Sequence, residues 1–161
     1  MSGTIPIVTA LSAATYAPNA PAMKNRSSSS KLTPAAGVES VELNGRHYFG
    51  LGLRFLPPFA NATRFTFLGG GEARVVRGDE RLTPARACAA TAAVDGKPVT
   101  LVMFDHNDNP RPALWFTMSA PFSYLSATQG LMDKPQHLAK GQTWHLRHGI
   151  ADGLVRGLRR R

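Results

Sequence analysis

Glycine, proline and Asn-Gly or Asp-Gly turns divide the chain into short segments, many of which alternate apolar and polar residues. Residues 63–68, for example, place two phenylalanines on one face of an extended segment and an arginine and a threonine on the other. No segment shows a convincing 3.6-residue apolar period of an amphipathic helix. Short strands joined by tight turns are typical of antiparallel sandwiches. We therefore predict an all-β fold, an antiparallel β-sandwich.

The expected strands follow the turn signals along the chain. They cover residues 38–43, 46–55, 63–68, 72–77, 86–94, 99–104, 122–129, 135–138 and 143–150. The Asn-Gly pair at 44–45 and the Asp-Gly pair at 95–96 are hairpin signals, so we expect each to join its two neighbouring strands. Gly50 and Gly52, inside an expected strand, predict a bulge or a close backbone approach.

Length and composition bound the domain organisation. A chain of 161 residues, 43% hydrophobic and 18% charged, suits one globular domain with a workable core. We expect this domain, the β-sandwich, at residues 38–153. Residues 1–37 contain several prolines and a serine run, so we expect a disordered or poorly ordered arm there. Residues 154–161 are expected to form a basic tail.

The net charge of +9 raises the question of nucleic-acid binding, which depends on clustered Lys and Arg. The basic residues are spread along the chain and cluster only in the tail, so nucleic acid is not an expected partner. No apolar run reaches the roughly 20 residues that cross a bilayer, so no membrane partner is expected. Residues 5–14 contain a proline and follow no basic residue, and we favour a cytoplasmic protein over a secreted one.

The chain contains a single cysteine, Cys88. One cysteine excludes an internal disulfide and a cysteine-only zinc site. Because Cys88 lies in an alanine-rich segment, we expect it to be a small buried hydrophobe. No metal and no cofactor is predicted.

A dense polar cluster follows the most apolar segment of the chain. Residues 105–109, Asp-His-Asn-Asp-Asn, come directly after the apolar run 99–104, and two prolines stiffen the segment beyond them. In one interpretation Asp105, Asn107 and Asn109 cap a turn by bonding nearby backbone amides. The alternatives are a metal site, an acid–base pair that draws a partner from elsewhere in the chain, and a loop that faces a glycan.

Three segments of the chain carry longer motifs. Residues 102–116 read Val-Met-Phe-Asp-His-Asn-Asp-Asn-Pro-Arg-Pro-Ala-Leu-Trp-Phe, residues 48–55 read Tyr-Phe-Gly-Leu-Gly-Leu-Arg-Phe, and residues 139–149 read Ala-Lys-Gly-Gln-Thr-Trp-His-Leu-Arg-His-Gly. In this order they resemble an Asp-His-Pro-x-Asn-Pro-Arg…Trp signature, a Gly-Leu-Gly-Leu-Arg-Phe strand and a closing Gly-Glu-x-Leu-x-Leu-Arg-Tyr-Gly strand. These motifs are those of the family catalogued as PmoA-like, or methane oxygenase PmoA.

The chain departs from the PmoA-like pattern at Asn107, Gln142 and His148, where the family usually has Pro, Glu and Tyr. The His-His-Arg-type motif of the family's N-terminal half has no counterpart, so the resemblance is to the C-terminal half only. It implies part of a large sandwich like that of galactose mutarotase, a partial supersandwich. A partial sandwich would expose a sheet edge, and we expect a partner chain or a second copy to cover that edge.

The predicted function is that of a carbohydrate-associated β-sandwich module of the PmoA-like family, truncated and without a complete catalytic site. Sugars are bound by planar polar groups beside an aromatic face. The candidate ligand-binding residues are His106, Asp108, Asn109, Arg111, Trp115 and Tyr124. Two alternatives remain open: a non-enzymatic accessory chain that completes another sheet, and a metal-dependent hydrolase or oxygenase that uses Asp105 and His106.

Overall fold

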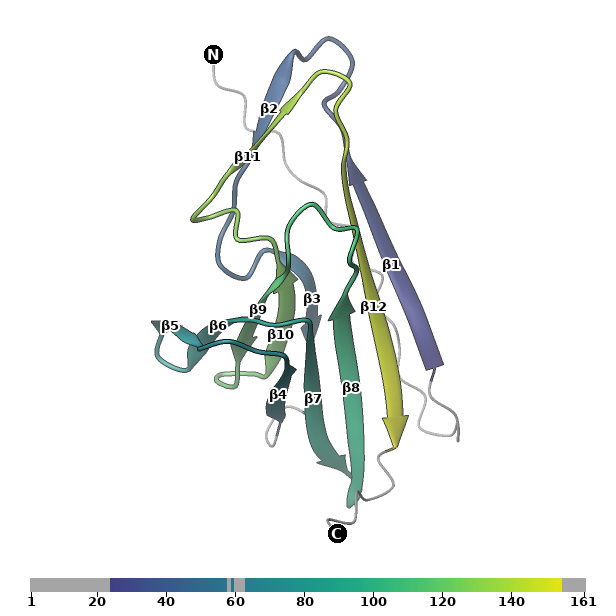
Figure 1. Ribbon diagram of the computed structural model, residues 1–161. Coiled ribbons are helices and arrows are strands. Elements are labelled where there is room, and N and C mark those ends of the chain that lie inside the picture. Colours follow the sequence, from purple (N-terminus) through teal and green to yellow (C-terminus); the bar gives the residue numbers. More distant parts are fainter. Residues whose placement is uncertain (1–23, 58, 60–62, 155–161) are drawn as a thin grey trace.

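The computed structural model of the chain describes residues 24–57, 59 and 63–154. The regular elements in these residues are all strands, which form two five-stranded sheets and one two-stranded ribbon (Figure 1). Neighbouring strands are antiparallel throughout. The prediction of an all-β antiparallel sandwich is confirmed.

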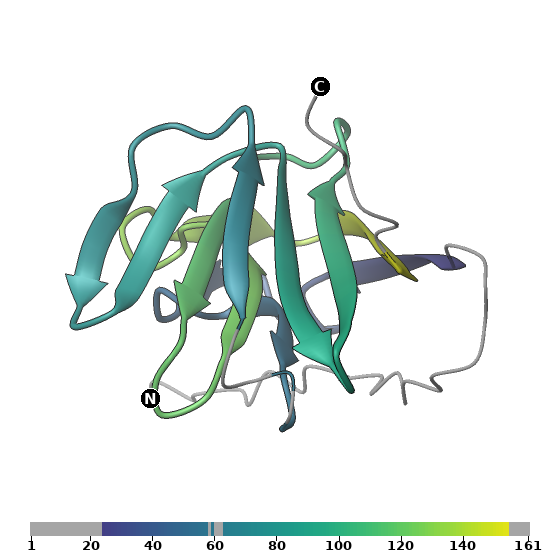
Figure 2. The same cartoon turned by 90° about the horizontal axis from the view of Figure 1, so that it is seen from below.

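The first sheet consists, in spatial order, of β1 (Lys24–Leu32), β12 (Trp144–Leu154), β8 (Lys97–Asp105), β7 (Ala87–Val94) and β4 (Arg64–Leu68). The second sheet consists of β3 (Gly50–Arg54), β10 (Tyr124–Thr128), β9 (Leu114–Met118), β6 (Glu80–Pro84) and β5 (Arg74–Arg77). The ribbon pairs β2 (Ser40–Leu43) with β11 (Gln136–Ala139). Figures 1 and 2 show β5 and the purple β1 at opposite sides of the molecule.

The two five-stranded sheets share a hydrophobic core. Cys88 and Met103 from the first sheet and Trp115 and Leu125 from the second are fully buried in one cluster. Cys88 and Met103 are direct partners in the register, so their side chains lie on the same, inner face. Burial raises the pKa of the Cys88 thiol to about 12, which agrees with the prediction that Cys88 is a small buried hydrophobic residue.

The Asp-Gly turn at residues 95–96 joins β7 to β8, as expected. Asp95 and Gly96 have positive φ values of 50° and 71°. Positive φ at both central positions matches the twist of a two-residue hairpin to that of its strands. This local geometry places the apolar run 99–104 in the middle of the first sheet.

The hairpin expected at residues 44–45 is wrong. β2 pairs with β11, and β3 pairs with β10. The reason is side-chain burial: Leu43 lies in a second apolar cluster with Leu138 and Trp144, which only the pairing of β2 with β11 brings together. Gly45 instead leaves room for the ring of Phe49, because a Cβ at position 45 would lie 2.8 Å from that ring.

The arm expected over residues 1–37 also needs correction, because Lys24–Leu32 forms the nine-residue edge strand β1. Its side chains are mostly polar, so their burial cannot account for the strand. Backbone pairing along β12 accounts for it, from Lys24↔Asp152 to Leu32↔Trp144. The rest of the predicted arm, residues 1–23, and residues 155–161 of the predicted tail lie outside the described residues.

The close backbone approach expected at the glycines of β3 is confirmed at Gly50, whereas Gly52 is approached by a side chain. A Cβ at Gly50 would collide with the backbone carbonyl oxygen of Ala127, and one at Gly52 would collide with the hydroxyl of Tyr124. Both neighbours belong to β10, the pairing partner of β3. The absence of side chains at these two positions therefore allows β3 to lie against β10.

Candidate functional site

Asp105 ends β8 and organises the loop that leads to β9. Its Oδ2 accepts a hydrogen bond from the backbone N–H of Ala113 at 2.7 Å, and its Oδ1 accepts one from the side-chain amide of Asn109. The side chain is only 12% exposed. A carboxylate that bridges the two ends of a loop acts as a cap. The capped-turn interpretation is confirmed for Asp105.

Asn109 ties the same loop to β12. Its Nδ2 donates to the carbonyl oxygen of Arg147 at 2.7 Å, and its Oδ1 accepts from the N–H of Arg147 at 2.7 Å. The side-chain amide thus forms the two hydrogen bonds that a paired strand residue would form. With its bond to Asp105, the amide of Asn109 is committed to the scaffold.

Arg111 holds the segment that precedes β11. Its guanidinium donates to the carbonyl oxygens of Lys134 and Pro135 and, at 2.8 Å, to Oε1 of Gln136. The guanidinium also lies 5.0 Å from the centre of the Trp144 ring, in cation–π geometry. Arg111 therefore connects the loop to the second apolar cluster and, like Asn109, serves the scaffold.

The two aromatic candidates lie away from the loop's exposed surface. Trp115 has no exposed surface and donates from Nε1 to the carbonyl oxygen of Ala85 at 2.8 Å. Tyr124 lies at the start of β10, and the residue that pairs with Leu114 lies at the end of this strand. The Tyr124 ring contacts the Phe116 ring edge-on. Burial raises the pKa of the Tyr124 phenol. A ligand at the loop therefore reaches neither ring.

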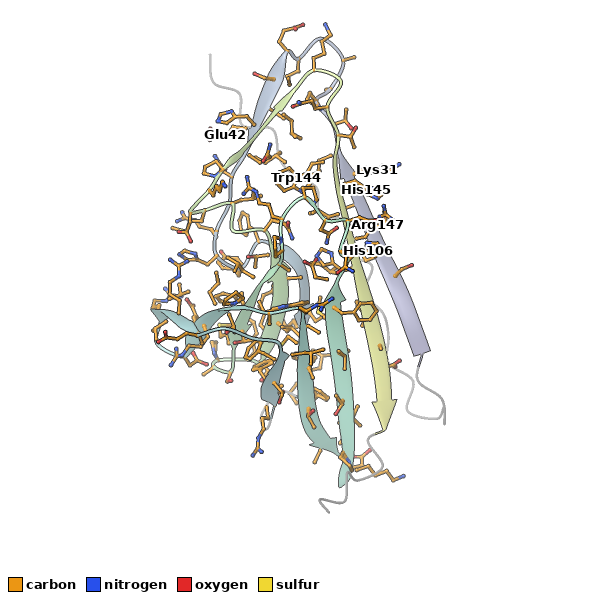
Figure 3. The ribbon with its side chains drawn as sticks, viewed as in Figure 1. Lys31, Glu42, His106, Trp144, His145 and Arg147 are labelled. Carbon is orange, nitrogen blue, oxygen red and sulfur yellow. The ribbon has the colours of Figure 1, made fainter. Side chains whose placement is uncertain are left out.

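His106 and Asp108 are exposed and lie beside β12. Oδ2 of Asp108 is 3.6 Å from Nδ1 of His106 and 3.4 Å from Nη2 of Arg147. His145 and Arg147 lie two residues apart on β12 and therefore on one face, and Lys31 of β1 is the register partner of His145. Figure 3 shows these cationic side chains following one another along the strands. We call Lys31, His106, His145 and Arg147 the basic strip.

His148 lies on the opposite face of β12 and is buried. Its Nε2 makes no hydrogen bond with the described residues and lies 3.6 Å from Oδ1 of Asp105. Burial lowers the pKa of His148, and the carboxylate of Asp105 offsets this only in part. The folded protein therefore keeps His148 neutral at pH values where the unfolded chain already protonates it.

This predicts that acid destabilises the fold through His148. Because the folded pKa lies below the unfolded value of about 6.5, the stabilising contribution is complete above that pH and is lost as the pH falls below it. We expect the free energy of unfolding, measured by urea titration, to fall between pH 7.5 and 5, and His148→Gln to reduce this slope. His137→Gln, at an exposed histidine 3.1 Å from Glu42, is the control for the loss of a surface imidazole. An unchanged slope in His148→Gln would contradict the prediction.

A separate hollow opens on the other side of the molecule, over the second sheet. It has a volume of about 470 Å³ and is lined by Arg46, His47, Tyr48, Val76, Arg77, Glu80 and Met132. Tyr48 is 47% exposed and Met132 is 43% exposed. We call this the tyrosine hollow. It combines an exposed aromatic side chain with two guanidinium groups and one carboxylate.

Both the backbone and the side chain of Tyr48 contact buried residues. The backbone carbonyl oxygen of Tyr48 accepts a hydrogen bond at 3.1 Å from the hydroxyl of Ser126, which is fully buried. The ring of Tyr48 packs against the buried ring of Phe116, with 5.9 Å between the centroids. Arg77 and Glu80, also in the lining, form an ion pair of 2.7 Å, which raises the pKa of Arg77. One side of the Tyr48 ring is therefore supported by Phe116.

The sequence signals for the hollow are weak. Its lining residues come from the segment before β3, from the β5–β6 hairpin and from the turn around Met132. Only the pairing of β3 with β10 and of β6 with β9 brings these segments together. An exposed Tyr-Phe pair next to a glycine-rich strand was the one local hint.

Neither a metal site nor a membrane span is found in the described part of the chain. No group of three or more His, Cys, Asp or Glu side chains is arranged to hold a metal ion there. Within the same residues, no helix has the length and hydrophobicity to cross a lipid bilayer.

Comparison with known proteins gives a family but no described relative. Neither a curated protein nor a solved structure matches the chain. A family model described as a family of unknown function, DUF6807, matches residues 26–152. The matched range begins within β1 and ends within β12, and so contains the loop at 105–113, the basic strip and the tyrosine hollow. The match covers well over half of the length of the chain, and the chain therefore belongs to the DUF6807 family of unknown function.

Proposed function

We propose that this chain is a non-enzymatic carbohydrate-binding module, related to the PmoA-like proteins that its motifs resemble, and that the sugar lies in the tyrosine hollow. The observation that carries the proposal is the exposed ring of Tyr48, which packs against Phe116 and is flanked by guanidinium and carboxylate groups. Sugars present apolar C–H faces and polar edges, so an aromatic face beside hydrogen-bonding groups suits them. The volume of about 470 Å³ lies in the range of small-ligand sites.

The hydrogen bonds within the polar loop at residues 105–113 favour a binding role over catalysis. Both carboxylate oxygens of Asp105 accept hydrogen bonds from the loop itself, and the amide of Asn109 is used in the same way. A general acid or base needs a free hydrogen-bonding position for its substrate. Asp105 is therefore better suited to hold the loop than to react.

The charges of the hollow favour an acidic sugar. Arg46 and Arg77 contribute two fixed positive charges, and Glu80, the one carboxylate in the lining, is paired with Arg77. A guanidinium group matches the two oxygens of a carboxylate. Uronic-acid oligosaccharides are accordingly the preferred class, and neutral oligosaccharides of equal length are the comparison.

The test is titration of the labelled protein with the two kinds of oligosaccharide, followed by NMR. We expect uronic-acid oligosaccharides to shift the amides of residues 46–48 and 76–80, and Tyr48→Ala to lower the affinity about two- to tenfold, since an aromatic contact contributes about 0.5–1.5 kcal/mol. Tyr48→Phe keeps the ring and should retain most of the affinity.

Phe49→Ala is the matched control. Phe49 is as exposed as Tyr48 and adjacent to it, with 5.1 Å between the ring centroids, but it does not line the hollow. This variant should bind almost as the parent does. Full affinity in Tyr48→Ala, or the same loss in both variants, would refute the placement of the sugar on Tyr48.

A further inference from the structure

The basic strip gathers four cationic or protonatable side chains from three segments on one exposed face. Lys31 comes from β1, His145 and Arg147 come from β12, and His106 comes from the loop after β8 (Figure 3). Among the described residues, Asp108 is the one carboxylate within ion-pair distance of any of them. Desolvation lowers the pKa of His145 most, and Arg147, Lys31 and His106 each lower it further, so these three groups lie within electrostatic reach of it.

The geometry of the strip is fixed by backbone contacts of Arg147 and by a hydrogen bond to the His145 ring. The backbone of Arg147 is held on both sides, by Asn109 and by its pairing with Ser29 on β1. The Oγ of Ser29 lies 2.8 Å from Nε2 of His145 and so orients the imidazole ring. The guanidinium of Arg147 and the ammonium of Lys31 remain exposed. A site built in this way is ordered beforehand and needs only its ligand.

We infer that the basic strip binds a tetrahedral oxyanion, the sulfate or phosphate group of an ester. An arginine fork and an ammonium group, which come from the neighbouring strands β12 and β1, supply several donors for the oxygens of such a group. The strip and the tyrosine hollow are formed by different strands, so this site does not depend on the carbohydrate proposal. Asp108 opposes the anion, because its negative charge lies beside Arg147 and His106.

Acid strengthens this site. The charged and titratable groups that face His145 are Lys31 on β1, Arg147 on its own strand, and His106 with Asp108 in the loop. The pKa of His145 is lowered, chiefly by desolvation and then by Arg147, Lys31 and His106, so its imidazole gains positive charge only as the pH falls below about 6.5. Sulfate keeps its double charge between pH 5 and 8. A change in the affinity of the protein for sulfate over that range therefore reflects a change in the protonation of the protein and not of the ligand.

The experiment is NMR titration of the full chain with sodium sulfate at constant ionic strength, with sodium chloride as the reference salt. We expect saturable shifts at residues 29–31, 106–108 and 145–147, with affinity for sulfate several-fold higher at pH 5.5 than at pH 7.5. Lys31→Gln and Arg147→Gln should each lower the affinity about tenfold. Asp108→Asn should raise it, which a merely structural role of Asp108 does not predict.

Arg26→Gln is the matched control for charge. Arg26 also lies on β1 and is exposed, but its register partner is Ile150, so it lies on the other face of the sheet from Lys31. This variant should bind sulfate within about twofold of the parent. Shifts that chloride reproduces equally, or the same loss in Arg26→Gln as in Arg147→Gln, would overturn the inference. Glucose 6-phosphate and galactose 6-sulfate, titrated next, distinguish the two ester classes.

Discussion

Trp115→Ala is expected to destabilise the protein by about 3–5 kcal/mol, the largest effect of any substitution considered. The side chain has no exposed surface and lies between the two sheets with Met103 and Leu125. Its removal leaves a cavity there and also leaves the carbonyl oxygen of Ala85 without its indole donor. Domains of this size have total stabilities of about 5–15 kcal/mol, so the loss is a large fraction of the total. Urea unfolding followed by far-UV circular dichroism measures it.

Trp115→Phe separates the two contributions. A phenylalanine retains much of the apolar volume but cannot donate to Ala85, so we expect a smaller loss of about 1–3 kcal/mol. A ligand-facing Trp115 would behave differently: Trp115→Ala would keep the parent's stability and lose only binding. That result would contradict the assignment of Trp115 to the core.

Asn109→Ala is expected to cost about 2–4 kcal/mol, although Asn109 lies in a loop. The substitution removes two hydrogen bonds to the backbone of Arg147 and one to the carboxylate of Asp105. Each such bond contributes about 0.5–1.5 kcal/mol, and the bond to a charged carboxylate contributes more. Hydrogen exchange should also show faster exchange of the N–H of Arg147, which loses its acceptor. Unfolding in urea gives the total loss.

Asn107→Ala is the matched control, two residues away in the same loop. Its side chain is exposed and makes no hydrogen bond within the described part of the chain. We expect a change within about 0.5 kcal/mol, as is usual for exposed positions. Equal effects of the two substitutions would show that the bonds to Arg147 do not hold the loop. Loss of affinity for sulfate in Asn109→Ala would be a secondary effect, since Asn109 positions Arg147.

The sequence predicts those parts of the fold that depend on local chemistry. The turn at 95–96 specifies its own hairpin, because both residues tolerate positive φ and strands flank them directly. The pair at 44–45 carries the same kind of signal, yet the partner of β2 is decided by the burial of Leu43 against Leu138. β1 was missed for the converse reason, since its serine run gives no apolar pattern and only the edge of β12 orders it.

The candidate site shows the same division. The polar cluster after β8 is visible in the sequence, and the capping role of Asp105 follows from its place at the end of a strand. The partners that commit Asn109 and Arg111 to the scaffold lie 38 and about 25 positions further along the chain, so no local pattern reveals them. Trp115 is a residue of the type that can stack on a sugar. The sequence pattern of β9, however, does not indicate which face of this strand packs against the other sheet.

The position of β1 beside β12 has a consequence for how the chain folds. Ser29 and His145, which meet across these strands, are 116 positions apart, whereas β7 and β8 are separated by a two-residue turn. Loop-closure entropy makes long-range pairings late events, because little is gained before the intervening chain is ordered. The β7–β8 hairpin can form first and offer β8 as a template for β12. Among the described residues β1 pairs only with β12, so we expect it to join last, and any oxyanion bound between them would act on this final step.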